Sequence, residues 1–240
     1  MNLEELVGYL RINILDDTGG TGINWKNIYE TCDENALLRW SNESLTEFIN
    51  EAIRKACRSS YLLKDMQVTF DITLLDGEDS YSLDPRIIKV KSVRLKSSGN
   101  RLSEIASEDI WDEVTRSGRE GLPTSYFVDE ITGEIGFYPT PTTASGLEDV
   151  EFITYREEMT PLDWDGDTED SPEVNPRYHV SILNYAAYLA YLKDEANSLD
   201  PQRAAQFLTL FREDFDDNSV YTEVRRVRRK RGTTSYGGIG

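Results

Sequence analysis

The feature of this sequence that most constrains its fold is the period of its apolar residues, which changes twice along the chain. Within residues 41–63 the apolar side chains recur at i, i+3, i+4 and i+7, the spacing of one helical face. This stripe consists of Leu45, Phe48, Ile49, Ala52, Ile53, Ala56 and Cys57. From residue 66 the period becomes two, as in half-buried strands, and after residue 175 it is helical again. The sequence therefore predicts an α+β protein.

Local signals place the ends of the predicted elements. Ser44 and Glu47 have the spacing of a capping box at the start of the long helix. Pro176 and Pro201, each preceded by a capping residue, open two further helices, and residues 3–15 form a short one. The segments SYFVD and EIGFY, separated by a turn with Gly133, predict a β-hairpin.

These elements predict a discontinuous organisation. Residues 1–65 and 156–218 are expected to form one helical bundle. Residues 66–155 are expected to form an inserted, mostly antiparallel β domain. Residues 219–240 have little periodicity and are expected to form an extended, flexible tail.

Charge is distributed unevenly between this tail and the rest of the chain. The formal net charge is −18, from 26 basic and 44 acidic residues. Residues 225–231 read RRVRRKR and hold six of the basic residues, so residues 1–224 carry −24. An acidic body with a basic tail predicts docking onto an acidic protein surface, on which the tail becomes ordered. That surface belongs either to a neighbouring copy of the chain or to a partner ring. The predicted partner-binding residues are Arg225, Arg226, Arg228, Arg229, Lys230, Arg231 and Tyr236.

The same basic run could instead contact phosphates and release counterions. This alternative makes the chain a nucleic-acid-associated regulatory or packaging factor. A body of charge −24 would repel a duplex, which favours the protein partner.

No motif of the sequence predicts catalysis, a cofactor or a metal. His179 is the only histidine, without a carboxylate at i+3 or i+4 and without a GxSxG motif. The GGTG of residues 19–22 lacks the Lys-Ser/Thr of a phosphate loop. Residues 163–170 read DWDGDTED, but Thr168 and Val174 stand where a calcium loop needs Gly and Glu. We therefore expect a protein that is not an enzyme; a carboxylate site without a motif is the alternative.

Composition also restricts where the chain acts. No stretch approaches the roughly 20 apolar residues of a membrane span. The first residues carry acids where a secretory signal carries Lys or Arg, so the chain is expected to act where it is synthesised. Cys32 and Cys57 are the only cysteines and predict no disulfide framework.

The order of motifs from the hairpin to the last helix resembles that of the head-to-tail adaptor (connector or gatekeeper) proteins of tailed bacteriophages. The resemblance covers residues 41–218. It consists of a strand ending in Pro139 and Pro141, a strand with alternating aromatics, an acidic spacer, a helix opening with Pro176, Tyr178 and His179, and a Phe-rich final helix.

This resemblance implies a structural subunit of the virion, made in the cytoplasm of the bacterial host. The subunit is expected to be a monomer when free and a ring of twelve copies at the head–tail junction. In this family the helical part builds the ring, and the C-terminal tail reaches onto the portal protein ring. The resemblance also implies that tail proteins, such as a nozzle, tail tube or fibre components, bind below, and that genome DNA passes through the bore without sequence-specific binding.

Overall fold

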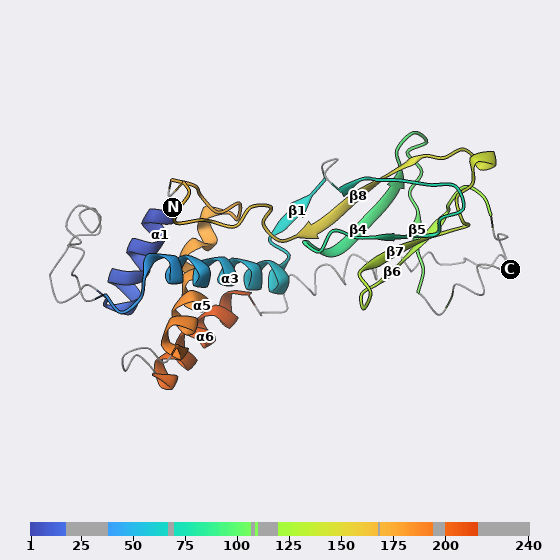
Figure 1. Ribbon diagram of the computed structural model, residues 1–240. Coiled ribbons are helices and arrows are strands. Elements are labelled where there is room, and N and C mark those ends of the chain that lie inside the picture. Colours follow the sequence, from blue (N-terminus) through green and yellow to red (C-terminus); the bar gives the residue numbers. More distant parts are fainter. Residues whose placement is uncertain are drawn as a thin grey trace, which may run out of the picture. The chain divides into compact units, whose positions relative to one another are not determined.

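The computed structural model describes residues 1–17, 38–66, 70–106, 109, 120–167, 169–193 and 200–215 (Figure 1). The chain divides into two compact units. Unit 1 comprises Met1–Leu62 and Thr160–Gly240, and unit 2 comprises Leu63–Met159. The described helices longer than one turn lie in unit 1 and the described strands in unit 2, which confirms the α+β class. The prediction that the helical segments form a single bundle stays a prediction.

Unit 1 is built from helices that come from both ends of the chain. They are α1 (Leu3–Tyr9), the π-helix η1 (Leu10–Leu15), α3 (Asn42–Ser60), the 3-10 turn η6 (Pro176–Tyr178), α5 (His179–Leu192) and α6 (Pro201–Phe215). Asn2 and Glu5 form a capping box at the start of α1, because each side chain accepts a hydrogen bond from the other residue's backbone amide. None of the described helices is long and apolar enough to cross a membrane.

Helix α3 has the predicted apolar face but a different start. Six of the seven stripe residues are buried, and Phe48 is half-buried. Ser41, one turn before Ser44, is the capping residue, and its hydroxyl accepts a hydrogen bond from the Ser44 amide at 3.1 Å. The predicted capping box at Ser44 and Glu47 is therefore wrong. Two serines three residues apart could each cap the helix, and Ser41 is the one whose backbone is extended.

Helix α5 holds unit 1 together by packing against both α3 and α6. Its buried residues therefore lie on more than one side. Aromatic rings fill the contact with α6: Tyr191 stacks on Phe207 at 5.7 Å between ring centres, and Tyr185 lies 4.9 Å from Phe211. Where α3 ends, the buried Ser60 hydroxyl donates to the carbonyl of Phe215 at 2.6 Å, which joins the ends of α3 and α6.

A buried polar network joins η1 to the start of α3. Arg11 is 1% exposed and Asp17 is 2% exposed, and Arg11 Nη1 lies 2.5 Å from Asp17 Oδ2. Arg11 Nη2 also donates to the Trp40 carbonyl at 2.6 Å and to Asn42 Oδ1 at 2.7 Å. The second oxygen of Asp17 accepts the backbone N–H of Arg39 at 2.9 Å. The chain thus returns at residues 39–42 to the place it left at residue 17.

The described residues of unit 2 form two sheets. In sheet A, β8 (Asp149–Arg156) is the central strand; β1 (Leu63–Asp65) and β2 (Ile72–Thr73) pair with one edge and β4 (Ile87–Leu95) with the other, all antiparallel (Figure 1). Sheet B has the order β3 (Ser80–Ser82), β7 (Glu134–Tyr138), β6 (Ser125–Asp129) and β5 (Ser103–Glu104). Only β5 and β6 pair in parallel among these strands. The predicted hairpin is confirmed as β6 and β7.

The core of unit 2 collects apolar side chains from both sheets. Its buried members are Leu74, Val90, Val93, Leu95, Leu102, Tyr126, Ile135, Phe137, Val150 and Phe152. On β6 and β7, the Phe127 ring lies directly over its cross-strand partner Gly136. A Cβ atom at residue 136 would lie 2.1 Å from Phe127 Cζ, so this position requires glycine as long as the ring stays in place.

Candidate functional site

The partner-binding residues predicted from the sequence lie outside the described residues. This holds for Arg225, Arg226, Arg228, Arg229, Lys230, Arg231 and Tyr236. Their role in docking stays a prediction. The GGTG of residues 19–22 and Cys32 also lie outside the described residues.

The acidic segment, residues 163–170, is a series of turns stabilised by its own carboxylates. Asp163 Oδ1 accepts the backbone N–H of Asp165 at 3.1 Å, and Asp167 Oδ1 accepts that of Glu169 at 2.9 Å. Among the residues that the structure describes, no group of three or more His, Cys, Asp or Glu side chains could hold a metal ion. The five acidic residues of the acidic segment are exposed, so the segment presents a concentrated negative charge at the surface of unit 1.

His179 is buried at the start of α5, with 2% of its surface exposed. Nε2 lies 3.1 Å from the carbonyl oxygen of Val174, which can only accept, so Nε2 carries the proton. Nδ1 is buried and has no hydrogen-bond partner in the described part of the chain. Burial lowers the pKa of His179, and the bond to the Val174 carbonyl acts in the opposite direction. These contacts give the ring a structural role, because they join the start of α5 to the backbone at Val174.

We expect the free energy of unfolding to fall as the pH falls from about 7.5 to 5.5, the window in which histidine titrates. The unfolded chain takes up a proton at the ordinary histidine pKa near 6.5, and the folded chain takes it up only at lower pH. The contribution of neutral His179 to the free energy of unfolding is therefore complete above the ordinary pKa. Below that pKa it declines by at most about 1.4 kcal/mol per pH unit.

The control for this pH dependence is His179→Gln, whose amide can still donate to the Val174 carbonyl. Denaturant unfolding at matched ionic strength should give a flatter pH curve for the variant, because the chain has no other histidine. Parallel curves for the two proteins would show that the pKa of His179 is the same in the folded and unfolded states.

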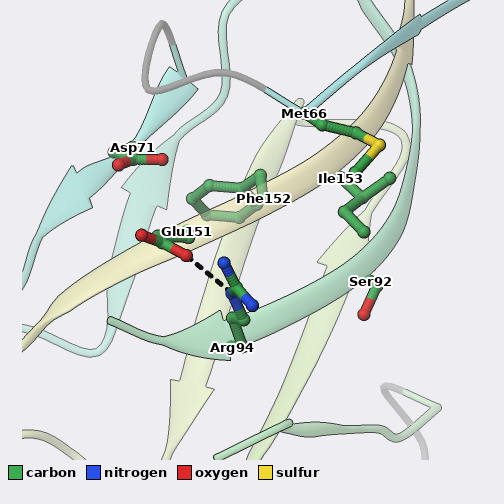
Figure 2. A pocket seen from close by; sticks show the side chains of 7 residues that line it. All are labelled: Met66, Asp71, Ser92, Arg94, Glu151, Phe152 and Ile153. Carbon is green, nitrogen blue, oxygen red and sulfur yellow. Dashed lines mark hydrogen bonds and ion pairs between the residues drawn. The ribbon is translucent and has the colours of Figure 1, made fainter. Parts of the chain in front are cut away.

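A small cavity of about 140 Å³ lies on the outer face of sheet A. Its lining residues are Met66, Asp71, Ser92, Arg94, Glu151, Phe152 and Ile153 (Figure 2). Figure 2 shows Arg94 and Glu151 facing each other, and Arg94 Nε lies 2.6 Å from Glu151 Oε2. Burial raises the pKa of Asp71, whose carboxylate lies 3.4 Å from Lys96 Nζ. Each charged group of this cavity thus has an oppositely charged partner, and the arrangement suits a surface contact rather than proton transfer.

Around this cavity, sheet A presents a group of cations that the sequence analysis missed. We call it the basic face and define it as Lys64, Lys89, Lys91, Arg94, Lys96 and Arg101. Lys64 and Lys89 are the cross-strand neighbours of Tyr155, from β1 and β4. Lys91 Nζ donates to the Tyr155 hydroxyl at 3.0 Å and lies 5.3 Å from its ring centre. A window count could have found this surface, because residues 86–101 contain six basic residues and no acidic one.

A comparison with protein-family models finds a match over almost the whole chain. A family model described as SU10 adaptor protein matches residues 1–235, which include all of unit 2, all but the last five residues of unit 1, and the basic run at residues 225–231. No curated protein matches the chain. The matched family is one of structural adaptor proteins of bacteriophages and not of enzymes. The match supports the resemblance to phage adaptors, and the chain belongs to the SU10 adaptor protein family.

Proposed function

We propose that this protein joins the portal of a tailed bacteriophage to its tail. Twelve copies form a ring beneath the portal at the head–tail junction, and tail proteins bind to the other side of the ring. The observation that carries the proposal is the adaptor-family match over residues 1–235. An adaptor family implies contacts with portal and tail components, and the chain has separate helical and β units available for these contacts.

In this proposal the basic tail is the part that docks on the portal. Six positive charges within seven residues, attached to a body of charge −24, would be attracted to an acidic partner surface while the body is repelled by it. Ordering a tail costs about 1–2 kcal/mol of backbone entropy per residue, so docking needs a preformed surface such as a completed portal ring. This requirement would keep free subunits from associating through their tails.

The negative body has a second consequence for a ring through which DNA passes. Acids repeated around a bore would repel the phosphates and keep the genome from adhering to the wall. The same charge disfavours the alternative function in nucleic-acid binding, which would depend on Arg225–Arg231 alone.

Neutralising the tail is expected to abolish docking. A chain with glutamine at all six basic positions of residues 225–231 should bind portal rings at least about 100-fold more weakly than the wild type, because the steering and contact charges are lost. The matched control replaces the five arginines of that run with lysine, which keeps the charge. Electron microscopy of protein mixed with portal rings gives the stacked particle, and sedimentation gives the affinity.

Undiminished docking of the glutamine variant would contradict the proposed role of the tail. If the full chain ignores portal rings but binds duplex DNA in a salt-sensitive way that the variant loses, the nucleic-acid alternative is correct. Circular dichroism of both variants checks that the fold is unchanged.

A further inference from the structure

The basic face of sheet A is unusual within its own unit. Unit 2 contains 20 acidic and ten basic residues, and six of the ten basic residues lie within residues 86–101. Cross-strand neighbours share a face of a sheet, so Lys64 and Lys89 lie on either side of Tyr155, and Arg101 lies beside Arg94. Glu151, the partner of Arg94, and Tyr155 are four residues apart on β8. The cations beside Tyr155 and those beside Glu151 therefore lie on the same face of sheet A.

Like charges placed next to each other in this way destabilise an isolated sheet. Arg94 is paired with Glu151, and Lys96 lies 3.4 Å from Asp71 and 3.9 Å from Asp149. Glu151, Asp71 and Asp149 are thus the carboxylates that pair with Arg94 and Lys96. Among the described residues, Lys64 and Arg101 make no side-chain ion pair. An anionic group bound over this face would relieve the remaining repulsion.

Protection of a sheet edge is the simpler explanation, because lysines on an edge strand discourage pairing with other sheets. That explanation covers Lys89 and Lys91 on β4. It does not cover Lys64, which lies across β8 on β1, nor the placement of Arg101 directly opposite Arg94. The outer face of the sheet, and not only its edge, is thus charged.

The chain itself carries the complementary surface. The acidic segment has five acids and no base within eight residues, and all five are exposed. Asp163 and Asp167 hold the local turns, whereas the side chains of Asp165, Glu169 and Asp170 make no hydrogen bond or ion pair among the described residues. Two complementary surfaces on one chain can meet between copies in a head-to-tail contact, in which each copy uses both surfaces.

We infer that the basic face of one copy binds the acidic segment of a neighbouring copy. DNA is a less suitable occupant, because its phosphates would also meet the surrounding acids of unit 2, whose net charge is negative. The inference rests on the proposed function in that it places this contact between adjacent subunits of the ring.

The test reverses the charge of each surface separately. The face-reversed variant is Lys64→Glu with Arg101→Glu, and the second substitution puts an acid opposite Arg94, so the sheet should not be weakened. The segment-reversed variant is Asp165→Lys with Glu169→Lys, which leaves Asp163 and Asp167 to hold the turns. A fourfold variant carries both reversals in one chain. Full-length proteins are compared by sedimentation over a concentration series, alone and on portal rings, with thermal unfolding as the folding control.

Each reversed variant alone should associate with itself at least about tenfold more weakly than the wild type, because like charges then lie opposite each other at the substituted positions of every contact. The fourfold variant, and an equimolar mixture of the two reversed variants, should associate more tightly than either reversed variant alone, since opposite charges then meet again at the substituted positions. In the wild type, zero-length carbodiimide crosslinks should join lysines of the basic face to the acidic segment. A mixture of ¹⁵N-labelled and unlabelled chains shows whether these crosslinks join different copies.

Several results would overturn the inference. Absence of wild-type association both alone and on portal rings would do so, as would failure of the mixture to regain association. Crosslinks confined to single chains would show an intramolecular contact instead. Loss of duplex DNA binding in the face-reversed variant alone would assign the surface to nucleic acid. All variants keep the basic tail, so portal docking is scored separately, and its absence in the wild type would count against the proposed function.

Discussion

Replacing Arg11 with methionine is expected to lower the free energy of unfolding by about 3–5 kcal/mol, because breaking a buried ion pair leaves an uncompensated charge. The substitution would leave the carboxylate of Asp17, only 2% exposed, without its partner at 2.5 Å. The Trp40 carbonyl and Asn42 Oδ1 would each lose a donor as well. Denaturant unfolding followed by circular dichroism measures the loss.

Arg54 provides the matched control for this prediction. It pairs with Glu51 at 3.1 Å on the exposed surface of α3, where both side chains are more than two-fifths exposed. Arg54→Met should cost no more than about 1 kcal/mol, as is usual for a surface ion pair. Adding Asp17→Asn to Arg11→Met should recover part of the loss, because the buried charge is removed. Equal losses for the two arginines would show that the buried network does not stabilise unit 1.

Replacing Phe137 with alanine is expected to cost about 3–5 kcal/mol, the usual penalty for removing a buried aromatic ring. Phe137 is fully buried between the two sheets of unit 2, and its ring meets that of Tyr81 edge-on at 5.6 Å. Residues from both sheets surround it, so they cannot collapse into the vacated space without moving a sheet. Thermal unfolding and denaturant unfolding should both report the loss.

The control for Phe137 lies on the same hairpin. Ile131, at the tip between β6 and β7, is 96% exposed, so Ile131→Ala should change the free energy of unfolding by less than about 0.5 kcal/mol. Phe137→Leu keeps most of the apolar volume and should give an intermediate loss. If Phe137→Ala were as harmless as Ile131→Ala, the two sheets would not be packed through this ring.

The sequence predicted those features that depend on local pattern. The apolar stripe of α3 and the hairpin of β6 and β7 each depend on a pattern within a short stretch of sequence, and both are confirmed. The start of α3 was wrong by one turn because Ser41 and Ser44 compete for the same role, and only the backbone conformation decides between them.

Features that depend on distant residues could not be predicted. Arg11 looks like any polar residue of an amphipathic helix, and its burial depends on Trp40 and Asn42, which lie 29 and 31 residues away. The basic face has a signal in its composition, but the pairing of Arg94 with Arg101 and the two register shifts in β4 decide which cations meet. The docking role predicted for the basic residues of 225–231 and for Tyr236 stays a prediction, because these residues lie outside the described part of the chain.

The order of synthesis on the ribosome gives the arrangement of β8 and α5 a further meaning. Strand β8 pairs with β1, β2 and β4, and α5 packs against α3. Each of these early elements therefore contacts an element that is synthesised much later. About 120 residues separate the end of α3 from α5, which corresponds to a delay on the order of ten seconds at about 5–20 residues per second. During that interval the apolar face of α3 lacks its native contacts with α5 and α6. We therefore expect nascent chains stalled before residue 179 to be substrates for chaperones and proteases, and chains released after α6 to be resistant.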